Sequence, residues 1–281
     1  MAERSLSFEF YPPKTDAGRR RFLRTLDALA RLEPSYVSVT FGAGGSTREK
    51  TFETVELIRA RTRLCAVPHI SCITSTRDEI HRYLKRYVDA GIPKVVALRG
   101  DRPRDGSPLP PRGEGFRYAA ELVTYIRRHF PSLRIAVACY PECHPESPTP
   151  HSDLRHFAEK VRAGADAAIT QYFFNNAAYY RFRDEAAALG VDIPIYVGLM
   201  PIWDWAQVRR FSEFCGADVP RWIRRRMDAF EGDAESQRAL GVEIAARQIE
   251  DLFAHGAPGI HFYTLNRAEP ILRIYEALGL R

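Results

Sequence analysis

The residues SLSFEF at Ser5–Phe10 alternate polar and apolar side chains near the start of the chain. A period of two is typical of a β-strand, whose successive side chains point to opposite faces of a sheet. The leucine and the two phenylalanines would face outer helices, while Ser5, Ser7 and Glu9 would point inward. A strand of this kind predicts a sheet with an apolar outer face and a polar inner one.

Short β-rich segments recur along the chain, with helical patterns between them. Their first residues are Ser5, Tyr36, Cys65, Lys94, Arg134, Ala167, Pro194 and Gly259. Strands that alternate with helices form a mainly parallel sheet, and eight of them favour a closed barrel over an open doubly wound sheet. We therefore predict the α/β fold class, with residues 1–281 forming a single-domain (β/α)8 TIM barrel.

The interval before the last predicted strand is unusually long. It covers 65 residues from Pro194 to Gly259, whereas the earlier starts lie 27 to 40 residues apart. Helical patterns occur in it around Trp203 to Phe214, near Trp222 to Phe230 and from about Glu235 to His255. We therefore expect extra helices before the last strand.

The alternation continues in other predicted strands. In the second strand, Val37 and Val39 would face outward, and Ser38 and Thr40 inward. In the fourth strand, Val96 and Leu98 would face outward, and Ala97 and Arg99 inward. In the last strand, Ile260 and Phe262 would face outward, and His261 and Tyr263 inward. Barrel enzymes build their active sites at the C-terminal ends of the strands. The polar residues expected at that mouth are Glu9, Thr40, His69, Arg99, Asp101, Tyr140, Glu142, His144, Gln171, Tyr263 and Arg267.

The composition describes a folded, mildly basic protein. With 45% hydrophobic and 27% charged residues, a full core can form. The net charge of +6 suits an anionic ligand, but the basic residues are scattered and form no stripe interleaved with aromatic residues. We therefore expect no nucleic-acid partner.

Secretion and membrane insertion are not expected. Met1 to Leu6 lacks a basic region followed by an apolar stretch, and no run of roughly 18 apolar residues occurs. The five cysteines are an odd number without C-x-x-C spacing, which fits a reducing compartment. These features indicate a cytoplasmic protein.

Three local motifs do not by themselves support a functional assignment. The turn Gly42–Thr47 lacks the third glycine of G-x-G-x-x-G and the ending of a P-loop, although its backbone could approach a ligand. Cys139, Cys143 and His144 lack the P-C-x-x-C half of a zinc-deaminase signature, so no metal site is expected. A G-x-S-x-G elbow is absent from the sequence, which leaves serine-hydrolase chemistry unsupported.

Six further motifs occur in a fixed order. They are SFEFYPP at Ser7–Pro13, YVSVTFGA at Tyr36–Ala43, ALRGD at Ala97–Asp101, YPECHPE at Tyr140–Glu146, AITQYFF at Ala168–Phe174 and HFYTLNR at His261–Arg267. Together they resemble the motifs of bacterial-type methylenetetrahydrofolate reductases. The resemblance runs from about Ser7 to Leu280, essentially the whole chain.

The resemblance implies a flavoenzyme that holds FAD at the mouth of a (β/α)8 barrel. The implied FAD-binding residues are Thr40, Phe41, Ala43, His69, Arg99, Gly100, Asp101, Tyr118, Ala119, Tyr140, His144, Asp153, His156 and Lys160. The implied substrate-binding residues are Glu9, Asp101, Gln171, Trp205, Tyr263 and Arg267. The family reduces 5,10-methylenetetrahydrofolate to 5-methyltetrahydrofolate for methionine synthesis, with NADH or NADPH as electron donor, and a homo-oligomer is implied.

Some of these assignments also have a physical reason. Arg99 and Lys160 can neutralise a pyrophosphate. His156 and Glu159 replace an amide and a basic residue of some relatives, and we expect Glu159 to point to solvent. Trp205 stands where the family often has a smaller aromatic residue, so it could stack on a planar ligand or simply pack between helices.

The implied mechanism is ping-pong, with NAD(P)H and the folate binding in turn. Opening of the methylene bridge to an iminium requires a proton on the departing nitrogen, and Glu9 resembles the family's general acid. Asp101 would tune the exchange through its negative charge. The Pro- and Gly-rich stretch from Arg102 to Arg112 is a candidate mobile lid.

Two other functions remain open at this point. A flavin-independent reductase could pass hydride directly from NAD(P)H to folate on the same barrel, and a non-enzymatic module could simply bind or store folate. The chain ends at Arg281, just after the expected barrel. We therefore expect no inhibition by S-adenosylmethionine, which the resemblance attributes to an extra C-terminal domain of eukaryotic relatives.

Overall fold

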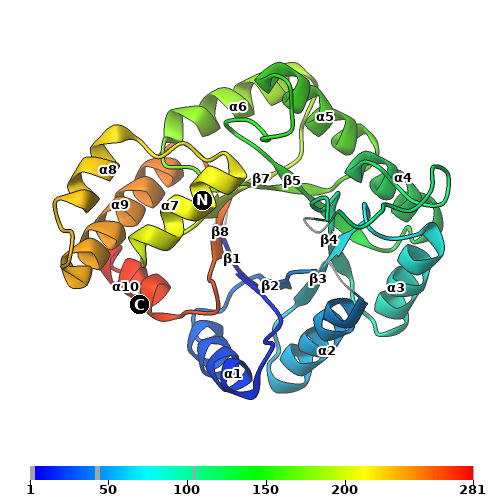
Figure 1. Ribbon diagram of the computed structural model, residues 1–281, viewed down its shortest axis with the longest axis horizontal. Coiled ribbons are helices and arrows are strands. Elements are labelled where there is room, and N and C mark those ends of the chain that lie inside the picture. Colours follow the sequence, from blue (N-terminus) through cyan, green and yellow to red (C-terminus); the bar gives the residue numbers. More distant parts are fainter. Residues whose placement is uncertain (1–3, 42–44, 104–105, 281) are drawn as a thin grey trace.

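The computed structural model describes residues 4–41, 45–103 and 106–280. Within them, parallel strands close into a barrel in sequence order, and the helices surround it (Figure 1). The strands are β1 (Ser5–Phe10), β2 (Tyr36–Val39), β3 (Ala66–Ser71), β4 (Lys94–Leu98), β5 (Arg134–Cys139), β6 (Ala167–Thr170), β7 (Ile195–Leu199) and β8 (Gly259–Tyr263). The TIM-barrel prediction is confirmed.

The helices follow the strands in the predicted alternation. They are α1 (Asp16–Ala30), α2 (Gly45–Arg61), α3 (Arg77–Asp89), α4 (Ala119–His129), α5 (Pro150–Arg162), α6 (Asn176–Ala188), α7 (Trp205–Cys215), α8 (Arg221–Asp228), α9 (Ala234–Ala254) and α10 (Glu269–Ala277). Of the predicted strand starts, only Cys65 and Pro194 differ from the structure, each by one residue.

Closure of the barrel brings the two ends of the sequence together. β1 pairs with β2 on one side and with β8 on the other, in a register that sets Ser5 opposite Gly259 and Glu9 opposite Tyr263. A Cβ atom at Gly259 would lie 2.2 Å from the carbonyl oxygen of Ser5, so a residue without a side chain is required there. This pairing places β8 residues beside Glu9.

The outer core lies between the strands and the surrounding helices. Phe8, Phe10, Val37 and Val39 are buried in it, as the alternation predicts. Phe10, for example, meets Phe22 of α1 edge-on with 5.4 Å between ring centroids. Burial of such side chains supplies most of the free energy that holds the helices to the barrel.

The interior of the barrel corrects one part of the prediction. Val96 packs inside with Tyr36, Val67, Ala136 and Ile169, and Leu98 lies against this layer. Ala97, by contrast, belongs to the outer core. The orientation predicted for this strand is therefore wrong. A parallel strand that is buried on both faces is apolar throughout, so its sequence does not reveal which face points inward.

The predicted extra helices are present as α7, α8 and α9 between β7 and β8 (Figure 1). Their contacts form a second apolar cluster, which contains Ile202, Trp205, Val208, Val219, Ile223, Met227, Leu240 and Ile244. Gly241 allows α9 to approach the backbone of Ile202 closely, because a Cβ atom at this position would lie 2.1 Å from the carbonyl oxygen of Ile202. The cluster holds the three helices beside the barrel mouth.

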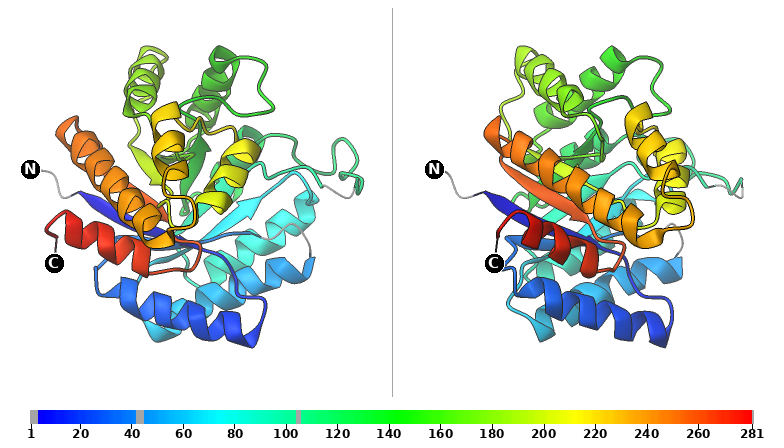
Figure 2. Two further views of the ribbon diagram at one scale, coloured as in Figure 1. Left: turned by 60° about the vertical axis from the view of Figure 1, so that its left-hand side comes forward. Right: turned by 90° about the vertical axis from the view of Figure 1, so that its left-hand side faces the viewer.

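The segment that joins β4 to α4 extends away from the barrel (Figure 2). The segment is fixed close to the start of α4, because Gly115 pairs with Thr76 and the backbone N–H of Arg77 donates to the carbonyl of Glu114 over 2.7 Å. The candidate lid from Arg102 to Arg112 includes residues 104 and 105, which lie outside the described residues, and its role as a lid stays a prediction.

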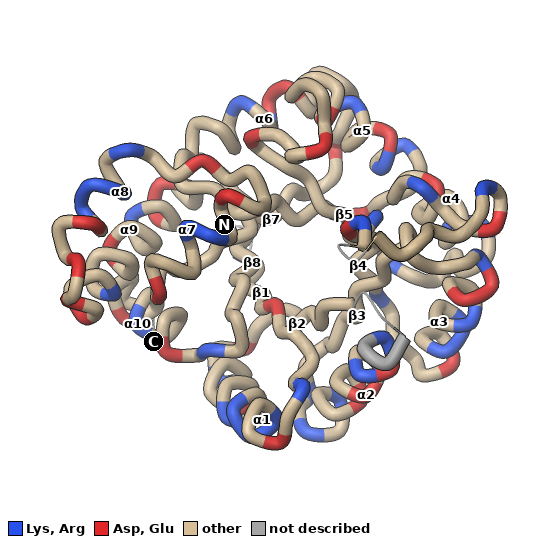
Figure 3. The backbone as a smooth tube through the Cα atoms, in the orientation of Figure 1, with Lys and Arg blue, Asp and Glu red and all other residues tan. Residues whose placement is uncertain are grey.

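Charges surround the barrel without forming one block. Lys and Arg lie among Asp and Glu on most of the outer helices, and α8 is mainly basic (Figure 3). Across residues 4–41, 45–103 and 106–280, we find no helix with the length and apolar character that a membrane span needs.

Candidate active site

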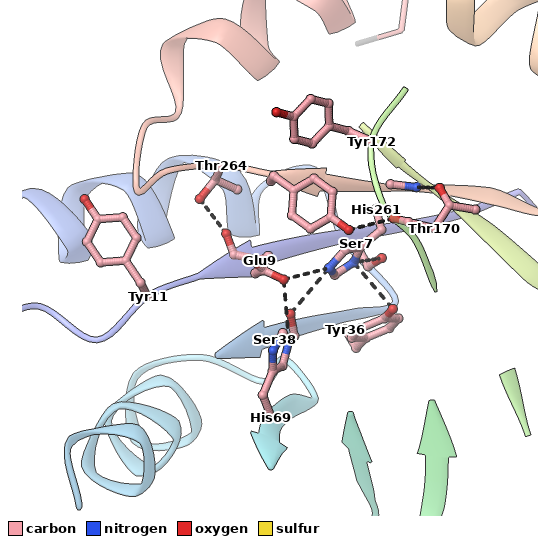
Figure 4. A network of polar contacts seen from close by, with 12 residues as sticks. Ser7, Glu9, Tyr11, Tyr36, Ser38, His69, Thr170, Tyr172, His261 and Thr264 are labelled. Carbon is pink, nitrogen blue, oxygen red and sulfur yellow. Dashed lines mark hydrogen bonds and ion pairs between the residues drawn. The ribbon is translucent and has the colours of Figure 1, made fainter. Parts of the chain in front are cut away.

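Glu9 lies at the mouth of the barrel between two histidines (Figure 4). Its Oε2 is 3.6 Å from Nε2 of His69 on β3 and 3.8 Å from Nε2 of His261 on β8. The strand end is fixed by Thr264, whose backbone N–H and hydroxyl both donate to the carbonyl of Glu9, the hydroxyl over 2.6 Å. The structure thus brings together the predicted residues Glu9 and His69 and adds His261.

His69 is buried, and this determines its charge. Burial lowers its pKa to about 4, and the nearby carboxylate of Glu9 raises the pKa only in part. Its Nε2 has no hydrogen-bond partner among the described residues. The imidazole is therefore uncharged near neutral pH. It gives Glu9 an uncharged polar neighbour.

Tyr263 stands beside this group on β8. Its hydroxyl donates to the carbonyl of Thr170 over 2.7 Å, and burial, with Glu9 nearby, raises its pKa well above the usual value. Gly198 makes room for the ring, since a Cβ atom there would lie 2.8 Å from the ring edge and 2.7 Å from the hydroxyl. Tyr172 meets the ring edge-on at 6.3 Å.

Two hollows in the surface flank these tyrosines. One is lined by Tyr140, Gln171, Tyr172 and Cys215, among others. The second includes Tyr263 and Arg267 in its lining, together with residues at the start of α7 and α10. The side chain of Arg267 forms no ion pair within the described parts of the chain. The predicted substrate residues Gln171, Tyr263 and Arg267 are therefore distributed over two neighbouring hollows.

Arg99 forms a two-pronged ion pair with Glu146. Its two terminal nitrogens lie 2.8 Å from the two carboxylate oxygens, and the pair lowers the pKa of Glu146. The next residue, Gly100, has a φ of +81°, which a residue with a Cβ rarely adopts. Asp101 is exposed. Glu146 lies in the motif at Tyr140–Glu146, and its sequence position alone predicts no role for it.

The loop after β5 is held by Asp153. One of its carboxylate oxygens accepts from the backbone N–H of His144 over 2.9 Å, and the ring of His144 lies edge-on to Tyr140 at 4.7 Å. Lys160 donates to the carbonyl of Ala138 over 2.5 Å, and burial lowers its pKa. These predicted FAD-binding residues thus surround one end of β5.

Tyr118 and His156 form an exposed pair of parallel rings between α4 and α5. Their centroids are 6.2 Å apart at an interplanar angle of 11°. His156 in turn lies 3.2 Å from a carboxylate oxygen of Glu159, whose side chain is 55% exposed. The prediction that Glu159 points to solvent is therefore confirmed. Ala119 begins α4 directly beside this pair.

Thr40 and Phe41 follow β2 at the mouth. The carbonyl of Thr40 accepts from the hydroxyl of Thr51 over 2.9 Å. The ring of Phe41 meets Tyr83 edge-on at 5.8 Å. Ala43, another predicted FAD-binding residue, lies outside the described residues.

Trp205 is packed between the extra helices. It is 6% exposed and belongs to the apolar cluster of α7, α8 and α9. Its indole N–H donates to Asp228 over 2.9 Å. The structure thus places this ring where the packing alternative expects it, and its stacking on a ligand stays a prediction.

Comparisons with known proteins extend this picture. The family model for methylenetetrahydrofolate reductase matches residues 1–279. The chain is 38% identical to 5,10-methylenetetrahydrofolate reductase of Escherichia coli over 277 residues, which cover 99% of this chain and 91% of that protein. It is 34% identical to methylenetetrahydrofolate reductase 1 of Schizosaccharomyces pombe, where the match covers 98% of this chain and 46% of the yeast protein.

The solved structures agree on the fold. An uncharacterized protein from Clostridium thermocellum, described as binding two copies of 5-methyl-5,6,7,8-tetrahydrofolic acid, superposes with a TM-score of 0.67. It shares 14% identity, and the match covers 99% of this chain and 95% of that one. Such low identity supports the barrel fold alone. The match over nearly the whole length, both to the family model and to its members, shows that the chain belongs to the methylenetetrahydrofolate reductase family, oxidoreductases that act on methylenetetrahydrofolate.

Proposed function

We propose that this chain reduces 5,10-methylenetetrahydrofolate to 5-methyltetrahydrofolate with FAD and NAD(P)H in a ping-pong cycle. The observation that carries the proposal is the position of Glu9, a carboxyl group at the barrel mouth beside the buried, uncharged His69. We further propose that the product supplies methyl groups for methionine synthesis, and that the protein is a cytoplasmic homo-oligomer.

The residues at the mouth are suited to hold FAD. Arg99 and Lys160, which pair with Glu146 and with the carbonyl of Ala138, would supply cationic donors for a pyrophosphate by exchanging these partners. The exposed rings of Tyr118 and His156 offer a flat surface for an aromatic group. The buried Nε2 of His69 has no partner among the described residues and can bond a polar edge. When bound, FAD would supply the redox centre that takes hydride from NAD(P)H and returns it to the folate.

The chemical task of Glu9 is a proton transfer. When the methylene bridge opens, a carbon–nitrogen bond breaks and its electron pair goes to the departing nitrogen. Glu9 would place its proton on that nitrogen, which leaves an iminium carbon able to accept hydride. Asp101 would stabilise the positive charge of the iminium through its carboxylate.

The substrate residues would orient the folate. Gln171 can donate and accept, so its amide can serve both a pterin edge and a nicotinamide amide in turn. Arg267, whose side chain has no acidic partner among the described residues, can pair with a carboxylate of the substrate. The two hollows beside Tyr263 are the surfaces that these groups line.

The decisive experiment separates the two half-reactions in the variant Glu9→Gln. Glutamine keeps the size of the side chain but cannot donate an acidic proton. We expect reduction of the flavin by NAD(P)H to be nearly unchanged. Oxidation of the flavin by methylenetetrahydrofolate should slow by roughly 10²- to 10⁴-fold, the usual effect of losing a general acid.

Stopped-flow absorbance of the flavin measures both steps. The matched control is Glu49→Gln, which changes an exposed carboxylate on α2 that pairs with Arg86. Equal slowing of both half-reactions in Glu9→Gln would contradict the acid role. Freshly purified protein without yellow flavin that still oxidises NAD(P)H with the folate would instead favour the flavin-independent reductase. Folate binding without turnover would leave only a storage module.

A further inference from the structure

His261 is fully buried inside the barrel, and the proposed function gives it no role. Its Nδ1 lies 2.7 Å from the hydroxyl of Ser7 and 3.4 Å from the hydroxyl of Tyr36 (Figure 4). The imidazole also stacks on Tyr36, with 5.7 Å between ring centroids and an interplanar angle of 20°. A polar ring in this position requires hydrogen bonds, because burying an unpaired polar group costs free energy.

The two hydroxyl groups can donate to Nδ1 or accept from it, depending on the tautomer of the ring. In a neutral imidazole that accepts at Nδ1, the proton is on Nε2. Nε2 faces Oε2 of Glu9 at 3.8 Å and the hydroxyl of Ser38 at 3.4 Å. The nearer of the two is Ser38, at hydrogen-bonding distance, whereas Oε2 of Glu9 lies at the longer distance of a polar contact.

We propose that His261 is a positioning residue for Glu9. In this proposal the imidazole carries its proton on Nε2, attracts Oε2 of Glu9 and leaves Oε1 to carry the transferable proton. The inference rests on the proposed role of Glu9 as the acid. Oε2 is also the carboxylate oxygen near Nε2 of His69, at 3.6 Å. A carboxyl group held by one oxygen presents the other to the substrate in a fixed direction.

Two amide variants test this geometry. In His261→Asn the amide reaches about as far as Nδ1, so it can meet Ser7 but not Glu9. In His261→Gln it reaches about as far as Nε2, so it can still donate to Oε2. We expect the asparagine variant to slow flavin oxidation by methylenetetrahydrofolate about tenfold, because the polar contact that positions Oε2 is lost. Reduction by NAD(P)H should stay within about twofold, and the glutamine variant should recover most of the loss.

A double variant asks whether His261 acts through Glu9. In the Glu9→Gln background, His261→Asn should cause no further slowing, because the group that it positions has already been changed. Additive slowing would overturn the proposal. His129→Asn, at an exposed histidine of α4, serves as the control and should match the parent. If His261→Asn fails to fold, Ser7→Ala removes the hydroxyl that lies 2.7 Å from Nδ1 and should slow the same half-reaction.

Nitrogen-15 NMR of histidine-labelled protein tests the contact without turnover. The Nε2 resonance of His261, assigned by its loss in His261→Asn, should move on the change Glu9→Gln. An unmoved resonance would overturn the contact. If both His261 variants match the parent while Glu9→Gln is selectively slow, only this inference fails. Equal slowing of both half-reactions by Glu9→Gln would remove the acid role and this inference with it.

Discussion

Arg99 offers the sharpest test of how the barrel mouth would hold FAD. Its guanidinium is already paired through two 2.8 Å hydrogen bonds with Glu146, and the two side chains are 20% and 46% exposed. A phosphate would compete with this carboxylate for the same fork of donors. The change Arg99→Ala removes the guanidinium group. The change Glu146→Gln removes the competing negative charge and keeps the size of the side chain.

The two expected effects differ in size. A hydrogen bond to a charged group contributes roughly 1.5–3 kcal/mol, so Arg99→Ala should weaken FAD binding roughly 10- to 150-fold. The ion pair itself is partly solvated and screened, so its loss should lower the free energy of unfolding by at most about 1 kcal/mol. Glu146→Gln should bind FAD at least as tightly as the parent, since Arg99 no longer has to leave a carboxylate.

Fluorescence titration of the flavin-free protein at fixed ionic strength measures the dissociation constant, and urea unfolding measures the stability. Arg86→Ala is the matched control, because Arg86 also pairs with a glutamate but lies on the outer surface. An Arg99→Ala variant that binds FAD within about twofold of the parent would refute the phosphate contact. Glu146→Gln that weakens binding as much as Arg99→Ala would instead show that the intact pair is needed.

Three further changes test other parts of the site. Trp205→Ala should lower the free energy of unfolding by roughly 3–5 kcal/mol, because it empties a buried position in the α7–α9 cluster. An unchanged midpoint of thermal unfolding would contradict this packing role. A raised KM for both folate and NAD(P)H would show that the ring also stacks on these ligands. The pKa of His69 is lowered to about 4 from 6.5, so between these pH values the unfolded chain binds a proton that the folded chain does not. The free energy of unfolding should therefore fall by roughly 3 kcal/mol as the pH drops through this window. Urea unfolding at a series of pH values should show that His69→Gln lacks this part of the pH dependence. Equal pH dependence of the parent and the variant would contradict this. Gly198→Ala would place a Cβ atom 2.0 Å from the carbonyl oxygen of Thr170 and 2.7 Å from the hydroxyl of Tyr263, so it should displace both and lower stability by at least roughly 1–3 kcal/mol. A crystal structure with both groups unmoved would oppose this.

The sequence alone determined the order and type of the elements. Alternating strand and helix patterns are local signals, and they placed six of the eight strand starts at the observed residues. The strand that carries Glu9 was oriented correctly, because only one of its faces is apolar. The sequence also carried the family motifs, since these are short runs of consecutive residues.

The tertiary structure decided the rest. β4 is apolar on both faces, so only its packing shows that Val96 points inward. Glu9 and His261 are 252 positions apart and meet because β1 pairs with β8 when the barrel closes. Arg99 and Glu146 lie in different loops, and no local sequence pattern predicts that they form an ion pair. Local periodicity reports which face of an element is apolar, but contacts between distant elements exist only once the chain is closed on itself.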